Sequence, residues 1–326
     1  MSLSSIIKNI PKAELHLHIE GSLTPELMWR LAKKHSVTLP YASVKEIEAA
    51  YNFEDLQSFL DLYYAGAGVL RDEEDFFTLM WEYLSRCHKE NIVHTEIMFD
   101  PQTHTERDIG FDVFMPGFLR AMDKAKQEYG ISSYLIMSFL RHLPESAAFE
   151  TLSEAEPYYK HITAVGLDSS ELGHPPSKFE RVFKKAKSLG FKIVAHAGEE
   201  GPASYIWEAI ELLDVDRIDH GVRCQEDKAL MALLKERQIP LTVCPLSNLK
   251  LCVIDDMKQH NIVELLNEGL LVTVNSDDPT YFGGFLNDNF VALQESLDID
   301  EDTIRTLAAN SFKSSFLPED VKRSFV

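Results

Sequence analysis

The chain has 326 residues, of which 45% are hydrophobic and 26% charged, the composition of a globular protein with a sizeable core. Its 52 acidic and 32 basic side chains give a net charge of −20, which argues against DNA or RNA as a partner. The four cysteines form no CxxC pair, no signal-like segment follows Met1, and no apolar run approaches the roughly 20 residues that a bilayer requires. We therefore expect a cytoplasmic protein without a membrane or nucleic-acid partner.

Eight apolar segments, rich in β-branched residues, alternate along the chain with segments of helical periodicity. The first predicted strand, 13–19, contains His16 and His18, which share a face because they are two positions apart. From 24 to 91 the pattern is helical, and we expect this long insertion to form a lid. The other strands are predicted at 92–99, 131–139, 162–168, 191–196, 216–220, 240–244 and 270–275. Helices are predicted at 114–129, 145–160, 178–189, 203–213, 227–237 and 263–267, with closing helices after 279.

This strict alternation predicts parallel strands that are joined by right-handed crossovers. Eight such units fit an α/β fold of the (β/α)₈ TIM-barrel type, as a single domain over 1–326. A doubly wound open sheet is the alternative. It is disfavoured because no glycine-rich phosphate-binding fingerprint follows the first strand.

Polar residues follow several of the predicted strands, and a barrel brings all these strand ends to one face. Three imidazoles and a carboxylate suit zinc, and they leave room for a water whose pKa the metal lowers. Taken alone, the two histidines of the first strand could equally be ordinary sheet residues. Together with the later strand ends, they predict one Zn²⁺ bound by His16, His18, His196 and Asp277.

Three further strand-end residues each have two interpretations. Glu199 could carry a proton to a substrate, or it could be a solvated loop acid. His220 could orient or deprotonate the metal-bound water, or it could be a buried histidine bonded to a backbone carbonyl. Asp278 could face a substrate, since adjacent residues in an extended chain point apart, or it could cap the turn before Pro279.

Five segments, taken in order, make the chain similar to the adenosine/adenine deaminase family. They are PKAELHLHIEGSL, HAGE, RIDHG, CPLSN and NSDDP, and they extend from Pro11 to Pro279. The resemblance implies a (β/α)₈ barrel with one zinc ion and hydrolytic deamination of a 6-aminopurine. It implies that Glu199 gives a proton to purine N1, that His220 activates the metal-bound water and that Asp278 contacts purine N7. It also implies the same four zinc ligands.

The expected substrate depends on two departures from the nucleoside deaminases of this family. These usually carry a Gly-Asp-Glu run after the fourth strand, and Asp where Glu20 stands here. We expect Glu171 to accept the N9–H of a free base and to crowd the ribose position, and Glu20 to fill the sugar pocket. The run DPQTHT at 100–105 is similar to the adenine deaminase branch.

These features favour adenine deamination in purine salvage, with a small-molecule purine as the partner. Deamination of adenosine or of an N6-substituted adenine is the alternative activity, because both would use the same metal site. A non-catalytic purine- or zinc-binding protein is the alternative of a different class. The presence of both Glu199 and His220 argues against it.

Overall fold

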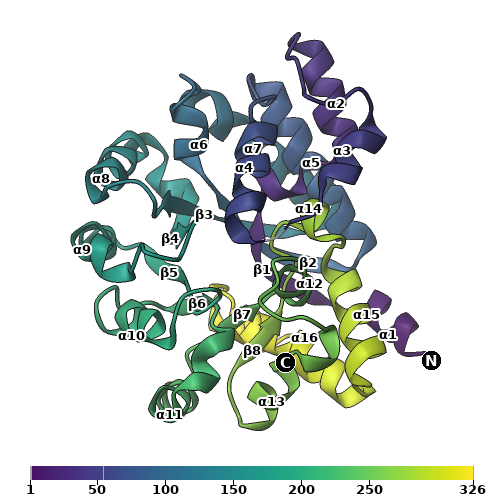
Figure 1. Cartoon of the computed structure of the whole chain (residues 1–326), viewed down its shortest axis with the longest axis vertical. Helices are drawn as coiled ribbons and strands as arrows, with labels where there is room; N and C mark the ends of the chain where they lie inside the picture. The colour runs from purple at the N-terminus through teal and green to yellow at the C-terminus, as the bar shows by residue number, and fades with distance from the viewer. Residues whose placement is uncertain (1, 54, 326) are drawn as a thin grey trace.

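The computed structural model describes residues 2–53 and 55–325. Eight parallel strands form one sheet in the order β1 to β8, and helices surround it (Figure 1). The strands are β1 Lys12–His18, β2 Ile92–Phe99, β3 Ser132–Leu140, β4 Ile162–Asp168, β5 Lys192–Ala197, β6 Arg217–His220, β7 Leu241–Val243 and β8 Val272–Val274. The (β/α)₈ prediction is confirmed.

The barrel closes through residues beyond β8. The N–H of His18 donates to the carbonyl of Asp277 at 3.0 Å, and the N–H of Asp277 donates to the carbonyl of His16 at 3.0 Å. The one bridge recorded between these two parts of the described chain pairs Leu17 with Asp277. Three of the four predicted metal ligands therefore lie at the seam where the first and last strands meet.

Four helices lie between β1 and β2, drawn in purple and blue in Figure 1. They are α2 Pro25–Lys34, α3 Val44–Ala50, α4 Leu56–Ala67 and α5 Glu73–Lys89. Their starts follow from local capping chemistry: the Thr24 side chain accepts from Leu27 N–H, and Asp55 and Asp72 each form a capping box. The helical insertion predicted at 24–91 is present.

The remaining helices cover the outside of the barrel or close the chain. They are α1 Leu3–Asn9, α6 Pro101–Thr105, α7 Phe111–Tyr129, α8 Glu145–Glu154, α9 Glu180–Ser188, α10 Ala203–Glu211, α11 Lys228–Arg237, α12 Pro245–Lys250, α13 Ile262–Asn267, α14 Pro279–Phe282, α15 Leu286–Leu297, α16 Glu301–Lys313 and α17 Glu319–Lys322. In the described part of the chain, no helix is both long enough and apolar enough to cross a membrane.

The short helices α6 and α12 were not predicted, and α14 lies at the start of the segment that was predicted to form closing helices. Helices α6, α12 and α14 each begin with a proline directly after a strand-end polar residue: Asp100, Cys244 and Asp278. Proline suits the first helical position, but four to six residues are too few to show helical periodicity. These short helices turn the chain sharply at the mouth of the barrel.

Candidate active site

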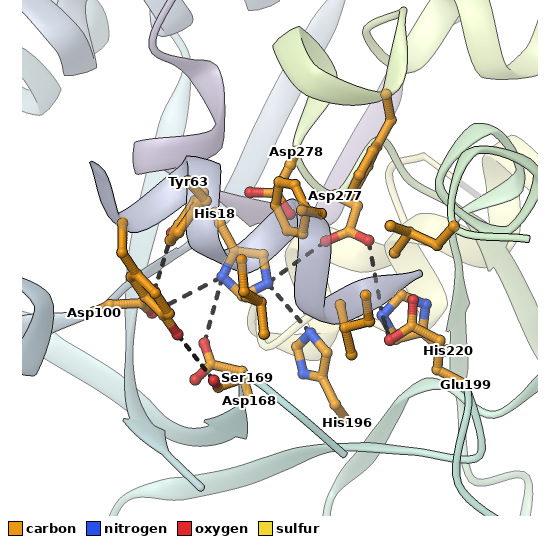
Figure 2. A pocket seen from close by; sticks show the side chains of 16 residues that line it. His18, Tyr63, Asp100, Asp168, Ser169, His196, Glu199, His220, Asp277 and Asp278 are labelled. Carbon is orange, nitrogen blue, oxygen red and sulfur yellow. Dashed lines mark hydrogen bonds and ion pairs between the residues drawn. The ribbon is translucent and has the colours of Figure 1, made fainter. Parts of the chain in front are cut away.

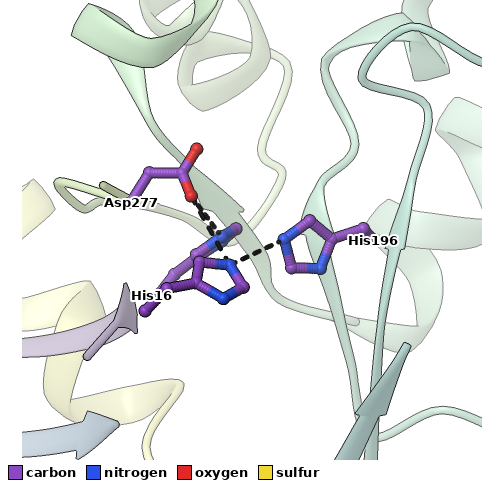
Figure 3. Close-up of side chains that lie close together, drawn as sticks. His16, His196 and Asp277 are labelled. Carbon is purple, nitrogen blue, oxygen red and sulfur yellow. Dashed lines mark hydrogen bonds and ion pairs between the residues drawn. The ribbon is translucent and has the colours of Figure 1, made fainter. Parts of the chain in front are cut away.

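Four buried side chains converge at the carboxyl ends of β1 and β5 and just after β8. The ligand atoms of His16, His18, His196 and Asp277 all lie within 4.8 Å of one another. His18 Nε2 is 3.2 Å from His196 Nε2. His16 Nε2 is 3.3 Å from Asp277 Oδ1 (Figure 3). His16 Nε2 is buried and has no hydrogen-bond partner within the described chain. Imidazole lone pairs this close to a carboxylate fit a metal ion bound between them.

The opposite nitrogen of each imidazole faces an oxygen. His16 Nδ1 is 3.0 Å from Thr242 Oγ1, and His196 Nδ1 is 3.6 Å from Asp219. His18 Nδ1 is 3.4 Å from Asp168. Such partners favour a proton on Nδ1, which leaves the Nε2 lone pair for a metal. Thr242 and Asp219 were not predicted as site residues, because polar residues inside a strand carry no distinctive pattern. Asp168 was predicted only as the last residue of its strand.

An unusual backbone conformation sets the direction of two side chains at the strand ends, Asp277 and His220. Asp277 has φ 63° and His220 has φ 64°, in the left-handed region that non-glycine residues avoid. Each such residue costs about 1–2 kcal/mol, which a fold retains where the side chain must point in one direction. Both side chains line the same cavity (Figure 2).

Glu199 and His220 face each other across this cavity, with Glu199 Oε2 3.5 Å from His220 Nε2. Burial, and then the charge of Asp277, raise the pKa of Glu199 well above its usual value. Burial, and then the neighbouring His16, lower the pKa of His220 to about 3. A carboxylic acid that keeps its proton and a neutral imidazole are suited to donate and accept protons, respectively.

Asp278 also lines the cavity, and its Oδ1 has no partner in the described chain. Burial, and then Asp277, raise the pKa of its carboxyl well above its usual value. Its position depends on Gly21, where a Cβ atom would lie 1.9 Å from Asp278 Oδ1. The glycine after β1 therefore lets the chain pass close to this carboxylate.

The structure places Glu171 outside the cavity lining. Its carboxylate accepts hydrogen bonds from the backbone N–H groups of Gly198 at 2.6 Å, Glu199 at 3.1 Å, Glu200 at 2.9 Å and Gly201 at 2.8 Å. Both oxygens are thus engaged by the loop that carries Glu199. This differs from the expected contact with purine N9–H, and it makes Glu171 the anchor of the loop after β5.

Glu20 lies one layer behind the cavity wall. Its Oε1 is 2.7 Å from His104 Nε2 and accepts from the N–H of Asp100 at 3.3 Å. Arg107 in turn lies 3.0 Å from His104 Nδ1. The run at 100–105 that resembles the adenine deaminase branch thus supplies both partners of Glu20 Oε1, while Glu20 Oε2 accepts from the hydroxyl of Tyr63 at 3.4 Å. Glu20 is not among the residues that line the cavity.

Helix α4 covers the cavity. It contributes the apolar side chains of Leu56, Phe59 and Leu60 and the phenols of Tyr63 and Tyr64. The other lining residues that sequence reasoning missed are Asp100, Asp168, Ser169, Leu251 and Phe282. The insertion after β1 therefore forms the roof over the polar strand ends.

Comparisons with known proteins agree with this architecture. A family model described as "Adenosine deaminase" matches residues 11–326. An adenine deaminase from Acinetobacter baylyi is 59% identical over 326 residues, which covers 100% of this chain and 98% of that protein. The crystal structure of an adenine deaminase from Arthrobacter aurescens superposes with a TM-score of 0.95 at 47% identity, covering 97% of each chain.

A more distant structure has the same fold. An amidohydrolase from Burkhoderia ambifaria, solved with bound zinc, has a TM-score of 0.91 at 23% identity and covers 99% of this chain and 90% of that chain. The family model and the long, highly identical relatives agree with the motifs and with the site. The chain belongs to the adenosine deaminase family, in its adenine deaminase branch.

Proposed function

We propose that this protein is a metal-dependent adenine deaminase that converts adenine and water to hypoxanthine and ammonia. The observation that carries the chemistry is the buried group of three imidazoles and one carboxylate beside Glu199 and His220 in one cavity. The choice of adenine is supported by a relative of that name with 59% identity along the whole chain. The cell would use such an activity to salvage purines, in the cytoplasm.

We propose one Zn²⁺ per chain as the metal, held by His16, His18, His196 and Asp277. This is supported by the preference of zinc for nitrogen and carboxylate ligands, and by the zinc in the related amidohydrolase. When bound, a divalent cation lowers the pKa of a water molecule and so supplies a nucleophile near neutral pH.

The side chains of the cavity then handle the protons. Glu199, whose pKa is raised, gives its proton to purine N1, which makes C6 more electrophilic. His220, whose pKa is lowered, accepts one proton from the attacking water, and this proton leaves with the departing ammonia. The second proton of the water returns to Glu199 as the C6 carbonyl of hypoxanthine forms. Asp278 donates a hydrogen bond to N7 and fixes the ring in the plane that the attack requires.

Two buried acids support these groups without touching the substrate. Glu171 holds Glu199 in place through the four backbone N–H groups of its loop. Glu20 braces the cavity wall through His104 and the backbone of Asp100. A rigid support of this kind keeps a reacting group within the small tolerance that catalysis demands.

The test is ultraviolet-monitored deamination of adenine, adenosine and N6-methyladenine, side by side, with protein of known metal content. We expect adenine to react far faster than adenosine. Faster reaction of adenosine would contradict the free-base assignment while leaving the deaminase chemistry intact. If N6-methyladenine alone reacts, the substrate is a modified base and not adenine. If zinc-loaded protein deaminates none of the three compounds, the proposed activity is contradicted.

A further inference from the structure

Two buried aspartates, Asp100 and Asp168, line the cavity, and the proposed mechanism uses neither of them. Each is only 2% exposed. Figure 2 shows both on the Nδ1 side of the His18 ring, away from His196, Asp277 and His220. The cavity therefore has a metal-ligand end and an acidic end, separated by one imidazole ring.

The carboxylates at the acidic end are short of hydrogen-bond donors. Neither oxygen of Asp168 has a hydrogen-bond partner in the described chain, and His18 Nδ1 lies 3.4 Å away. Asp100 Oδ2 accepts from the hydroxyl of Tyr63 at 2.9 Å, but Asp100 Oδ1 has no partner there either. A buried acceptor without a donor destabilises a protein, so a fold that keeps two such groups side by side points to a ligand that donates to them.

A free purine base presents a suitable donor at the end of the ring system opposite its reacting carbon. Its imidazole ring carries an N–H, on the side of the bicycle remote from C6, whereas a nucleoside carries a sugar carbon at that nitrogen. Accepting that N–H would remove the cost of an unpaired carboxylate. A nucleoside would leave the carboxylate without a donor, and its sugar would clash with the carboxylate.

We infer that Asp100, with Asp168 beside it, accepts the imidazole N–H of the base and selects free bases over nucleosides. The inference rests on the proposed function, because it places C6 of the purine at the metal-ligand end. Both carboxylates face Nδ1 of His18, a candidate metal ligand, but Asp168 is the nearer, at 3.4 Å against 3.9 Å for Asp100. Asp100 is therefore the residue at which selectivity is tested with the smaller disturbance of His18.

The surroundings of Asp100 keep its carboxylate from retreating. Its backbone N–H donates to Glu20, and its side chain is held by Tyr63 of helix α4. Glu20 is fixed in turn by His104, which is buried. Because these partners come from three different segments, the acceptor keeps its place when a nucleoside approaches.

The experiment compares adenine with 9-methyladenine, which lacks the N9–H. The kcat/KM ratio of the two substrates is measured for the wild type and for Asp100→Asn, with Asp100→Ser as a second variant in case the first folds poorly. The exposed Asp108, on the same segment, provides the matched control Asp108→Asn. Where turnover is too slow, the inhibition constants of hypoxanthine and 9-methylhypoxanthine supply the same ratio.

We expect the wild type and Asp108→Asn to prefer adenine, and both Asp100 variants to lose about 10- to 100-fold of that preference while retaining one metal ion per chain. An unchanged preference in variants of a wild type that deaminates adenine would overturn this inference alone. Two metal ions per wild-type chain would also overturn it, because His18, Asp100 and Asp168 would then hold a cation. A wild type without activity on adenine would overturn the proposed function, and this inference with it.

Discussion

The barrel interior contains two clusters of buried charged side chains that differ in how many of their polar atoms have hydrogen-bond partners. One lies around Glu96 on β2 and Arg217 on β6, both fully buried. Glu96 accepts from Arg217 Nη1 at 2.6 Å and from the N–H of Phe316 at 2.5 Å, and its Oε1 is 3.2 Å from His94 Nε2. Burial raises the pKa of Glu96, but Arg217 and His94 outweigh it, and the net pKa is lowered. This carboxylate is ionised and its hydrogen bonds are made within the protein.

The other cluster lies at the strand ends, where equally buried groups have orphan atoms. His16 Nε2, Glu199 Oε1, Asp278 Oδ1 and both oxygens of Asp168 have no hydrogen-bond partner in the described chain. The residue types and the depth of burial match those around Glu96. In the first cluster, which we call the complete cluster, both oxygens of Glu96 have donors, and of the Glu96, His94 and Arg217 side chains only Arg217 Nε lacks a hydrogen-bond partner in the described chain. The second cluster has many such atoms, all facing one site, which points to a ligand that binds there.

The largest expected effect is at a predicted metal ligand. His16→Ala should abolish metal binding and adenine deamination. The protein should remain folded, because the strand-end cluster serves to bind a ligand rather than to stabilise the fold. Metal content by atomic absorption, activity and circular dichroism are measured together. His94→Gln, in the complete cluster, is the matched control and should keep its metal. Full activity of His16→Ala without metal would refute the assignment.

Glu199→Gln should lower kcat by roughly 10²–10⁴-fold and leave metal content unchanged, since general acid catalysis has this magnitude. Glu200→Gln, on the same loop, should stay within a few-fold of the wild type. The raised pKa means that Glu199 is protonated below that pKa, so activity should fall as pH rises through it. If the activity of the Gln variant falls in the same way as pH rises, or if its turnover is near normal, then another group donates the proton.

Removal of one partner from the complete cluster should affect stability rather than binding. Glu96→Ala removes the carboxylate that is hydrogen-bonded to the buried Arg217 and leaves it only the more distant Asp219, 3.8 Å from its Nε, so the free energy of unfolding should fall by about 3–5 kcal/mol. Denaturant titration measures this loss, and the folded fraction should still bind one metal ion. A stability equal to that of the wild type would break the distinction between the two clusters.

The smallest of these effects is expected at the anchor of the catalytic loop. Glu171→Gln replaces two acceptor oxygens by one, and kcat should fall by about 10- to 100-fold with little change in KM, because Glu199 is displaced while the binding groups remain. Glu208→Gln is the control, because its half-buried carboxylate accepts a single N–H, from Ser177 at 2.9 Å. A change in KM alone would make Glu171 a substrate contact, as first expected from the sequence.

Sequence reasoning was strongest where one rule covers many residues. The alternation of strands and helices predicted the barrel, and the strand-end rule brought His16, His196 and Asp277 together although they lie far apart in the chain. These inferences use patterns that repeat along the chain, and local detail does not affect them.

The same reasoning does not extend to contacts that depend on the conformation of one loop. The contact of Glu171 with purine N9–H was predicted from the departure from the Gly-Asp-Glu run of the nucleoside deaminases. That comparison could not show that the turn of the 198–201 loop directs four N–H groups at this carboxylate. Asp100 was noted only as part of a resembling run, since no pattern in the sequence shows that one of its oxygens lacks a donor. Whether a buried polar atom has a hydrogen-bond partner can be determined only from the three-dimensional structure.

The most direct test of the account is zinc titration of metal-free protein, with adenine deamination as the readout. We predict no activity without metal, a rise with added zinc and a plateau at one ion per chain. Full activity in the metal-free protein, or none after one ion has bound, would contradict the conclusion that the unpaired strand-end groups form a catalytic metal site.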